Sequence, residues 1–435
     1  MGKLIDKKLL LPFILITACF SLWGFANDIT NPMVEAFSRI FNTSVTQATL
    51  VQVAFYGGYF AMALPAAFFL RKYDYKWGVL MGLGLYAIGA FLFFPAKATG
   101  NFYPFLAAYF IMTCGLSFLE TSCNPYILVM GDHSSATRRL NLAQAFNPIG
   151  SLSGMFVAMY CIQNQLDPID KDSRAMLPVN QFEAVKEHDL SVLIGPYLFI
   201  GLVILVLFLV IFFMKMPKED VKESKGGSSA SASWGRLLRN REYVCGVIAQ
   251  FFYVGVQIMC WTFIIQYGKR IFMGEGIAEG EASSMAQKYN IIAMCLFCCS
   301  RFICTFLMRF VNAGRLLGIL AVAGGALVLG VIFIDGRVGL WCLVCVSACM
   351  SLMFPTIYGI ALGKVSMEDA KFGAAGLIMS ILGGSVLPPL QSLIIDQKTV
   401  LGLPAENASF VVPFICFIVV AVYGFVMVKH LRSSN

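Results

Sequence analysis

Long apolar runs recur along the whole chain and are separated by short polar segments. A helix needs about 20 apolar residues to cross a bilayer. Runs of that length from one end to the other predict an all-α membrane protein with twelve spanning helices. The predicted spans are residues 9–36, 46–70, 77–96, 103–130, 138–162, 191–214, 240–267, 286–308, 315–334, 338–363, 373–395 and 408–429.

The composition supports this prediction. Hydrophobic residues make up 58% of the 435 residues and charged residues only 13%, whereas soluble domains carry roughly 25% charged residues. Lipid is therefore the expected solvent for most of the surface. The fourteen cysteines lie mostly in apolar runs, and no histidine lies near either Cys-x-x-Cys pair, so we expect packing residues and no metal site.

Positive charges gather in alternate polar segments. If both termini are cytoplasmic, the cytoplasmic segments hold about twice as many Lys and Arg residues as the outer ones. This bias predicts a multi-pass protein with both ends inside and a first helix that is retained rather than cleaved. No basic stripe follows one face, so the net charge of +8 does not indicate nucleic-acid binding.

Weak internal repeats predict two related halves. Trp23 is matched by Trp261, and Asn124-Pro125-Tyr126-Ile127 is matched by Phe354-Pro355-Thr356-Ile357, at a common spacing of about 230–240 residues. Residues 215–235 are first charged and then rich in Gly, Ser and Ala, which is typical of a flexible linker. We predict a six-helix bundle over 1–214, a cytoplasmic linker over 215–235 and a second six-helix bundle over 236–435. Two parallel six-helix halves are the arrangement of the major facilitator superfamily.

Glu120 is the strongest functional candidate. An ionisable residue within a membrane helix is costly and marks a functional site by default. Glu120 lies near the middle of its predicted span and shares a helical face with Ser117 and Asn124. Burial favours the uncharged form of a carboxyl, so Glu120 could carry a proton through the membrane. The alternative is a neutral Glu that only joins neighbouring helices by a hydrogen bond.

Polar residues also follow one face of the predicted span 138–162. Asn141, Gln144, Asn147 and Ser151 recur at spacings of three and four. Amides both donate and accept hydrogen bonds, which suits sugar hydroxyls. Hydrogen bonds between helices are the alternative use of the same groups.

The end of the first span permits two interpretations. Hydropathy alone ends the helix at Ala26, and Asp28 would then cap it from an outer loop. If the helix instead continues to Phe37 with a kink at Pro32, then Asn27, Asp28 and Asn31 face the interior of the bundle.

The second half offers amides and aromatic rings rather than carboxylates. The seventh span carries Gln250, Tyr253, Gln257 and Trp261 on one face, and Phe354 and Tyr358 flank Pro355 on the tenth. Aromatic rings could cover the C–H face of a sugar, although in membrane helices they more often serve packing. Arg301 lies about 10 Å from the nearer end of its helix, where a gate or a packing ion pair is favoured over contact with substrate. A polar, uncharged, ring-shaped solute would suit both halves.

Several segments together resemble the fucose:proton symporter family of bacteria (L-fucose permease-like), within the major facilitator superfamily. They are Trp23-Gly24-Phe25-Ala26-Asn27-Asp28, Phe55-Tyr56-Gly57-Gly58-Tyr59-Phe60, Phe118-Leu119-Glu120-Thr121, Arg139-Leu140-Asn141-Leu142-Ala143-Gln144-Ala145-Phe146-Asn147, Tyr253-Val254-Gly255-Val256-Gln257 and Phe354-Pro355-Thr356. The resemblance covers nearly the whole chain. It implies import of a monosaccharide, most specifically L-fucose, with protons by alternating access across a bacterial inner membrane.

The resemblance also implies roles for individual residues. Family members use a carboxylate at the Glu120 position for proton coupling, and the Gln144 and Asn147 positions lie in the cavity. We expect Glu120 and Asp28 to couple protons, no cofactor besides the proton itself, and a monomer in the bilayer. Expected sugar contacts are Asn27, Asn31, Asn124, Gln144, Asn147, Gln257, Trp261 and Phe354, with Arg301 as a gate or packing residue.

Two departures from the family leave the sugar open. The best-matched fucose symporters carry Asp where this chain has Asn31, and Asn where it has Asp28. The segment Phe69-Leu70-Arg71-Lys72-Tyr73-Asp74 also lacks the acid of the superfamily's Gly-x-x-x-Asp-Arg signature. Glucose, galactose or an N-acetylated sugar is therefore the alternative substrate, and a membrane sugar sensor is the remote alternative. An enzyme is not expected, because no reactive group of His, Ser and Cys occurs.

Overall fold

The structure, a computed structural model, describes residues 5–30, 33–43, 47, 50–169, 171–217, 230–395, 397, 399–400 and 402–432. Within these residues, twelve helices are long and apolar enough to cross a membrane. The predicted all-α architecture with twelve spans is confirmed.

Residue contacts divide the chain into two compact units. The first unit comprises Asp6–Met130 and Phe146–Glu223, and the second comprises Met1–Ile5, Gly131–Ala145 and Ser224–Asn435. A short internal segment, Gly131–Ala145, is therefore grouped with residues far along the chain. Much of the predicted linker lies outside the described residues, and its last residues belong to a helix that begins at Ala230.

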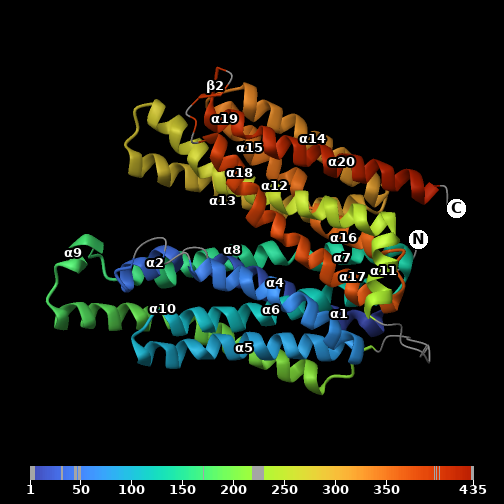
Figure 1. Cartoon of the computed structure of the whole chain (residues 1–435), viewed down its shortest axis with the longest axis horizontal. Coiled ribbons are helices and arrows are strands. Elements are labelled where there is room, and N and C mark those ends of the chain that lie inside the picture. Colours follow the sequence, from blue (N-terminus) through green and yellow to red (C-terminus); the bar gives the residue numbers. More distant parts are fainter. Residues whose placement is uncertain are drawn as a thin grey trace. The chain divides into compact units, whose positions relative to one another are not determined.

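The first unit is a bundle of long helices (Figure 1). Helix α5 packs against α6 and α10, α4 packs against α6, and α1 packs against α8. Its elements are η1 (Lys7–Leu9), α1 (Leu10–Thr30), α2 (Met33–Ile40), α4 (Leu50–Lys72), α5 (Tyr75–Thr99), α6 (Tyr103–Val129), α8 (Asn147–Val157), the π-helical turn η3 (Ala158–Ile162), η4 (Gln163–Gln165), α9 (Lys171–Ala175) and α10 (Val179–Phe213).

Glycines bring α8 unusually close to α1. A Cβ atom on Gly150 would lie 1.8 Å from the carbonyl oxygen of Ser21, and one on Gly154 would lie 2.6 Å from that of Phe25. Only glycine permits this approach, which is a common device in membrane bundles. The polar residues that begin α8 are thereby held directly beside α1.

The second unit is organised around α12, which packs against α13, α16, α18 and α20. Helix α7 packs against α16 and α13. A two-stranded antiparallel ribbon pairs Thr399 with Pro404. The elements are η2 (His133–Ser135), α7 (Ala136–Gln144), α11 (Ala230–Arg239), α12 (Arg241–Gly274), α13 (Glu279–Leu307), α14 (Ala313–Phe333), α15 (Arg337–Met350), α16 (Met353–Leu362), α17 (Met367–Met379), η5 (Ser380–Leu382), α18 (Gly383–Ile395), β1 (Thr399–Val400), β2 (Leu403–Pro404), α19 (Ala405–Ser409) and α20 (Val411–Arg432).

Two candidate spans are interrupted by prolines. The span Ala136–Gln165 breaks between α7 and α8, three residues or fewer before Pro148, and the span Arg337–Leu362 breaks between α15 and α16, just before Pro355. Proline has no amide N–H to donate, and its ring collides with the carbonyl four residues earlier. The polar residues predicted over 138–162 therefore lie on two helical segments of one candidate span. Asn141 and Gln144 belong to the second unit, whereas Asn147 and Ser151 belong to the first.

Candidate functional site

Glu120 lies on α6 in the interior of the first unit, with only 2% of its surface exposed. The hydroxyl of Tyr59 on α4 interacts electrostatically with the Glu120 carboxyl. Neither Glu120 Oε2 nor the Tyr59 hydroxyl has a fully formed hydrogen bond among the described residues. The carboxyl is thus enclosed by apolar helices, and its Oε2 atom can still accept a hydrogen bond.

The neighbours of Glu120 on its helical face are engaged with the backbone. Ser117 Oγ donates to the carbonyl of Tyr59 at 3.0 Å, which ties α6 to α4. Asn124 Nδ2 donates to the carbonyl of Glu120 at 2.9 Å, one turn back along the same helix. Both side chains are fully buried, so they fix the local geometry around the carboxyl.

Helix α1 extends beyond the apolar run and includes Asn27 and Asp28 in its last turn. The hydropathy-based end at Ala26 is wrong, because these two polar residues are half-buried rather than free in a loop. Asp28 interacts electrostatically with Tyr56 of α4, and the Thr30 hydroxyl donates to the carbonyl of Ala26 at 2.7 Å. Asn31 lies outside the described residues.

The polar side chains of α8 are used between helices. Asn147 Nδ2 donates to the carbonyl of Phe20 at 3.1 Å, and Ser151 Oγ donates to that of Gly24 at 3.4 Å. These bonds match the interhelical alternative for the polar stripe. Asn147 is nevertheless only half-buried.

In the second unit, α7 is joined to α16 by polar and close apolar contact. Asn141 Nδ2 donates to Thr356 Oγ1 at 3.1 Å and to the carbonyl of Thr137 at 2.9 Å. A Cβ atom on Gly359 would lie 2.9 Å from Thr137 Oγ1, so the two helices touch at this point. Gln144, the last residue of α7, is almost completely buried.

Arg301 of α13 is buried, with 3% of its surface exposed. Its Nη1 donates to the carbonyl of Gln144 at 2.9 Å, and its Nε donates to the carbonyl of Ser351. The guanidinium carbon lies 4.6 Å from the centre of the Phe297 ring. No ion pair in the described part of the chain includes Arg301. The packing ion pair expected from the sequence is not found there, and backbone carbonyls take its place.

The aromatic residues expected to contact sugar are half-buried in the second unit. Trp261 Nε1 donates to Ser347 Oγ at 3.2 Å, and its ring meets Phe297 edge-on at 5.0 Å. Gln257, one turn before Trp261, is also half-buried. Phe354 is half-buried and lies between Tyr253 and Tyr358, with ring centres 6.4 and 6.3 Å away. Gln250, from the same predicted stripe, is instead fully enclosed.

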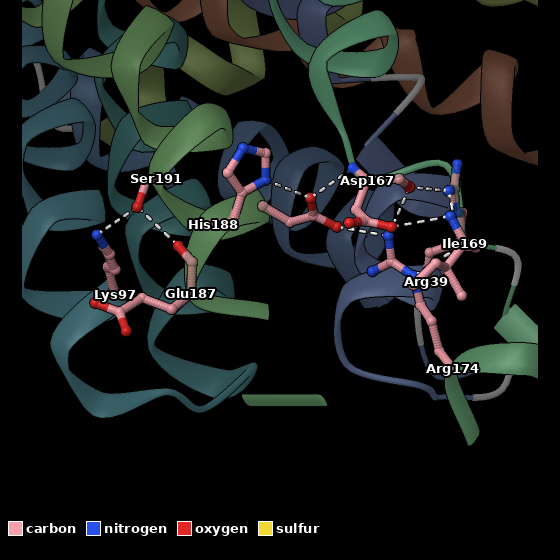
Figure 2. A network of polar contacts seen from close by, with 9 residues as sticks. Arg39, Lys97, Asp167, Ile169, Arg174, Glu187, His188 and Ser191 are labelled. Atoms are coloured by element: carbon pink, nitrogen blue, oxygen red, sulfur yellow. Dashed lines mark hydrogen bonds and ion pairs between the residues drawn. The ribbon is translucent and has the colours of Figure 1, made fainter. Parts of the chain in front are cut away.

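A separate polar network holds the segment around α9 onto the first unit (Figure 2). Arg174 and Asp189 form an ion pair of 2.7 Å, and both side chains are completely buried. Arg39 Nη2 donates to the carbonyl of Asp167 at 2.6 Å, and the amide of Asp167 donates to Asp189 Oδ1 at 2.8 Å. The sequence did not indicate this network, because its members lie in a polar segment that hydropathy marks only as a loop.

Three further residues near the candidate site were missed as site residues. Tyr59 faces Glu120, Thr356 binds Asn141, and Phe297 lies between Arg301 and Trp261. Tyr59 and Thr356 lie in segments that carry the family resemblance, which was the available signal. No sequence signal marked Phe297, because its role depends on packing between α12 and α13.

The sequence model of the Major Facilitator Superfamily matches residues 14–388 of the chain. The L-fucose-proton symporter of Haemophilus influenzae is 51% identical, over 99% of this chain and 100% of that protein. The L-fucose-proton symporter of Escherichia coli is 33% identical, over 96% of this chain and 93% of that protein. A crystal structure of the transporter FucP in the outward conformation superimposes with a TM-score of 0.86 at 33% identity, covering 97% of this chain and 99% of that one.

Proposed function

The chain belongs to the Major Facilitator Superfamily, and on this premise we propose that it imports L-fucose together with protons by alternating access. Like its relatives, it is a multi-pass membrane transporter and not an enzyme. The observation that carries the proposal is the buried Glu120 carboxyl in a chain that is 51% identical, end to end, to an L-fucose-proton symporter.

Glu120 is the proposed proton carrier. An apolar enclosure favours its uncharged form, because few groups are present to stabilise a carboxylate there. Tyr59 is positioned to donate to the carboxylate once the proton leaves. The carboxyl would take up a proton when the cavity is open to the outside and lose it when the cavity opens to the cytoplasm. Asp28 supplies a second carboxylate on α1, where it could receive or pass on the proton.

The sugar contacts are proposed to come from both units. In the first unit, Asn27 and Asn147 offer amides, and the proposal adds Asn124 of α6 and Asn31, which follows Asn27 by four residues in the sequence. In the second unit, Gln144 and Gln257 offer amides, while Trp261 and Phe354 offer ring faces. An amide can both donate a hydrogen bond to a hydroxyl and accept one from it. An aromatic face suits the C–H surface of a pyranose or a methyl group.

The placement in the membrane follows from charge. The excess of Lys and Arg in alternate segments supports cytoplasmic termini, and the relatives support a bacterial inner membrane. We further propose that the chain works as a monomer, with one six-helix bundle over 1–214 and another over 236–435, joined by a linker over 215–235.

The exchange of acid and amide between positions 28 and 31 favours a second candidate substrate. It alters the polar groups at the end of α1, where a sugar hydroxyl would bind. Glucose or galactose, which carry a hydroxymethyl group where fucose carries a methyl group, is therefore the alternative.

The test is uptake of labelled L-fucose into cells that lack their own sugar carriers, with the external pH recorded. We expect uptake to be accompanied by alkalinisation of the medium and to be abolished by a protonophore. Unlabelled fucose should compete better than glucose, galactose or N-acetylglucosamine. Stronger competition by glucose or galactose would favour the alternative, and fucose uptake without proton movement would contradict symport.

A further inference from the structure

Two backbone carbonyls in the second unit lack their usual helical partners, and prolines explain both. In a helix, the amide of residue i+4 donates to the carbonyl of residue i. Four residues after Gln144 stands Pro148, and four residues after Ser351 stands Pro355. Neither proline has an N–H to donate, so each of these carbonyls lacks the donor four residues later that a regular helix supplies.

Arg301 binds both of these carbonyls. Its Nη1 donates a hydrogen bond to the carbonyl of Gln144, at the end of α7. Its Nε donates to the carbonyl of Ser351, which follows the last residue of α15. A helix C-terminus carries about half a unit of negative charge. Two such ends therefore balance one guanidinium, which explains how the cation is buried although no carboxylate among the described residues forms an ion pair with it.

We propose that Arg301 is a positioning residue that fastens the half-helix α7 to α13 and α15 by bridging the two proline-freed carbonyls. We call this arrangement the Arg301 clasp, made of Arg301, Gln144 and Ser351. Release of the clasp lets α7 leave the second unit during the transport cycle. The inference rests on the proposed function only in assuming that the chain changes conformation to transport.

The grouping of the chain supports this role. Residues 131–145 cluster with the second unit, although the same candidate span continues as α8 in the first unit. A second polar tie between α7 and a neighbouring helix is the bond from Asn141 to Thr356. The clasp is charge-assisted and bridges two helix ends, so it is the stronger of the two.

The clasp also lies next to the proposed sugar contacts. The guanidinium covers the Phe297 ring, and Phe297 in turn meets Trp261 edge-on. On the other side, the clasp holds the main chain of Gln144, whose side chain is another proposed sugar contact. A sugar bound at Trp261 and Gln144 would therefore contact one member of the clasp directly and Arg301 through Phe297, which gives a physical route from binding to release.

The experiment measures the exposure of α7 in the purified protein. Thr137, which touches Gly359, is changed to Cys, and its alkylation rate is followed by mass spectrometry of the peptide that contains it. This resolves residue 137 from the fourteen native cysteines. We expect Arg301→Gln to raise the rate about tenfold, because a charge-assisted bridge is lost, and Arg301→Lys to give an intermediate value.

Two proline variants test the mechanism without removing the arginine. Pro148→Ala and Pro355→Ala each restore an N–H that competes with Arg301 for its carbonyl, so alkylation should rise about threefold. Combining Pro355→Ala with Arg301→Gln should add little to Arg301→Gln alone. The matched control is Pro196→Ala in α10, which also lies inside a helix but is not four residues after a clasp carbonyl. It should leave the rate unchanged.

The outcomes separate the clasp from the proposed function. Equal alkylation in wild type and in the arginine and proline variants would overturn the clasp, whatever the protein transports. If Arg301→Gln does not fold, as judged by its elution and thermal unfolding, the proline variants decide alone. Failure of the wild type to take up fucose would overturn the proposed substrate but would not change the alkylation result, because that assay contains no sugar.

Discussion

Glu120 in the first unit and Arg301 in the second are both ionisable side chains buried within membrane helices, and the two are neutralised in opposite ways. Glu120 in the first unit is enclosed with an unpaired carboxyl oxygen and a single tyrosine nearby. Arg301 in the second unit donates to two carbonyls and lies over an aromatic ring. The Glu120 carboxyl has an oxygen that can still accept a hydrogen bond, whereas the Arg301 guanidinium already donates to two carbonyls and contacts an aromatic ring.

This difference separates a group that changes charge from one that keeps it. A poorly solvated carboxyl loses little when it becomes neutral, so its proton can be exchanged. A guanidinium cannot be deprotonated in a protein and must be compensated by its surroundings. The first arrangement suits proton coupling, and the second suits a bridge whose making and breaking moves helices.

Replacing the proton carrier should produce the largest effect. We expect Glu120→Gln to abolish uphill uptake while exchange of sugar across equilibrated membranes continues. One proton crossing 100 mV supplies about 2.3 kcal/mol, so the accumulation ratio should fall by about fiftyfold. Labelled sugar in energised vesicles gives the ratio. Glu183→Gln, on an exposed glutamate of α10, is the control and should behave as wild type. Wild-type accumulation by Glu120→Gln would remove the contrast between the two units.

The buried ion pair between Arg174 and Asp189 in the first unit extends the comparison. Asp189→Asn keeps the oxygen that accepts from the Asp167 amide but leaves the Arg174 guanidinium without a carboxylate. Breaking a fully buried pair typically costs about 3–5 kcal/mol, so the melting temperature in detergent should fall clearly. Removing the second charge as well, with Arg174→Met, should restore part of the loss. An unchanged melting temperature would show that water reaches this pair.

Much of the fold was predictable because a bilayer imposes strict limits on sequence. Twelve apolar runs gave twelve spans, and Glu120 was evident because a lone carboxyl interrupts one of them. The end of α1 was not predictable from hydropathy, since Asn27 and Asp28 are polar yet helical. Hydropathy averages over a window and cannot tell which side of a helix a polar residue faces.

The environment of Arg301 could be predicted only in part. Pro148 and Pro355 were visible in the sequence, and each frees the carbonyl four residues before it. That both carbonyls meet one arginine depends on packing between α7, α13 and α15, which no local pattern encodes. The same holds for Phe297, whose position between Trp261 and Arg301 is purely tertiary.

The second acid of the first unit tests whether Glu120 works alone. Asp28 is half-buried and interacts with Tyr56, so it is less isolated than Glu120. We expect Asp28→Asn to lower proton-driven uptake by about threefold to tenfold, because part of the local charge balance remains. Simultaneous recording of sugar and proton uptake would show whether the ratio changes. Unchanged uptake and ratio would leave Glu120 as the sole coupling carboxyl and would make the contrast with Arg301 sharper.

The smallest effect is expected where a carboxylate meets water. Asp335 lies between α14 and α15, and Arg270 Nη2 approaches its Oδ1 to 2.6 Å. This hydrogen bond holds the pKa of Asp335 below its ordinary value. The folded state therefore favours the ionised form, and the resulting stability is present above about pH 4 and is lost as the pH falls through the lowered pKa.

Because the Asp335 side chain is 57% exposed, solvent screens the pair and its contribution is small. Asp335→Asn should lower the melting temperature by about 1–2 °C at pH 7, and the difference from wild type should shrink near pH 3. No ion pair within the described segments includes Arg301, so the melting difference for Arg301→Gln should be the same at both pH values. A pH-dependent difference there would mean that a carboxyl reaches Arg301 after all, and the two units would then neutralise their buried charges by the same chemistry.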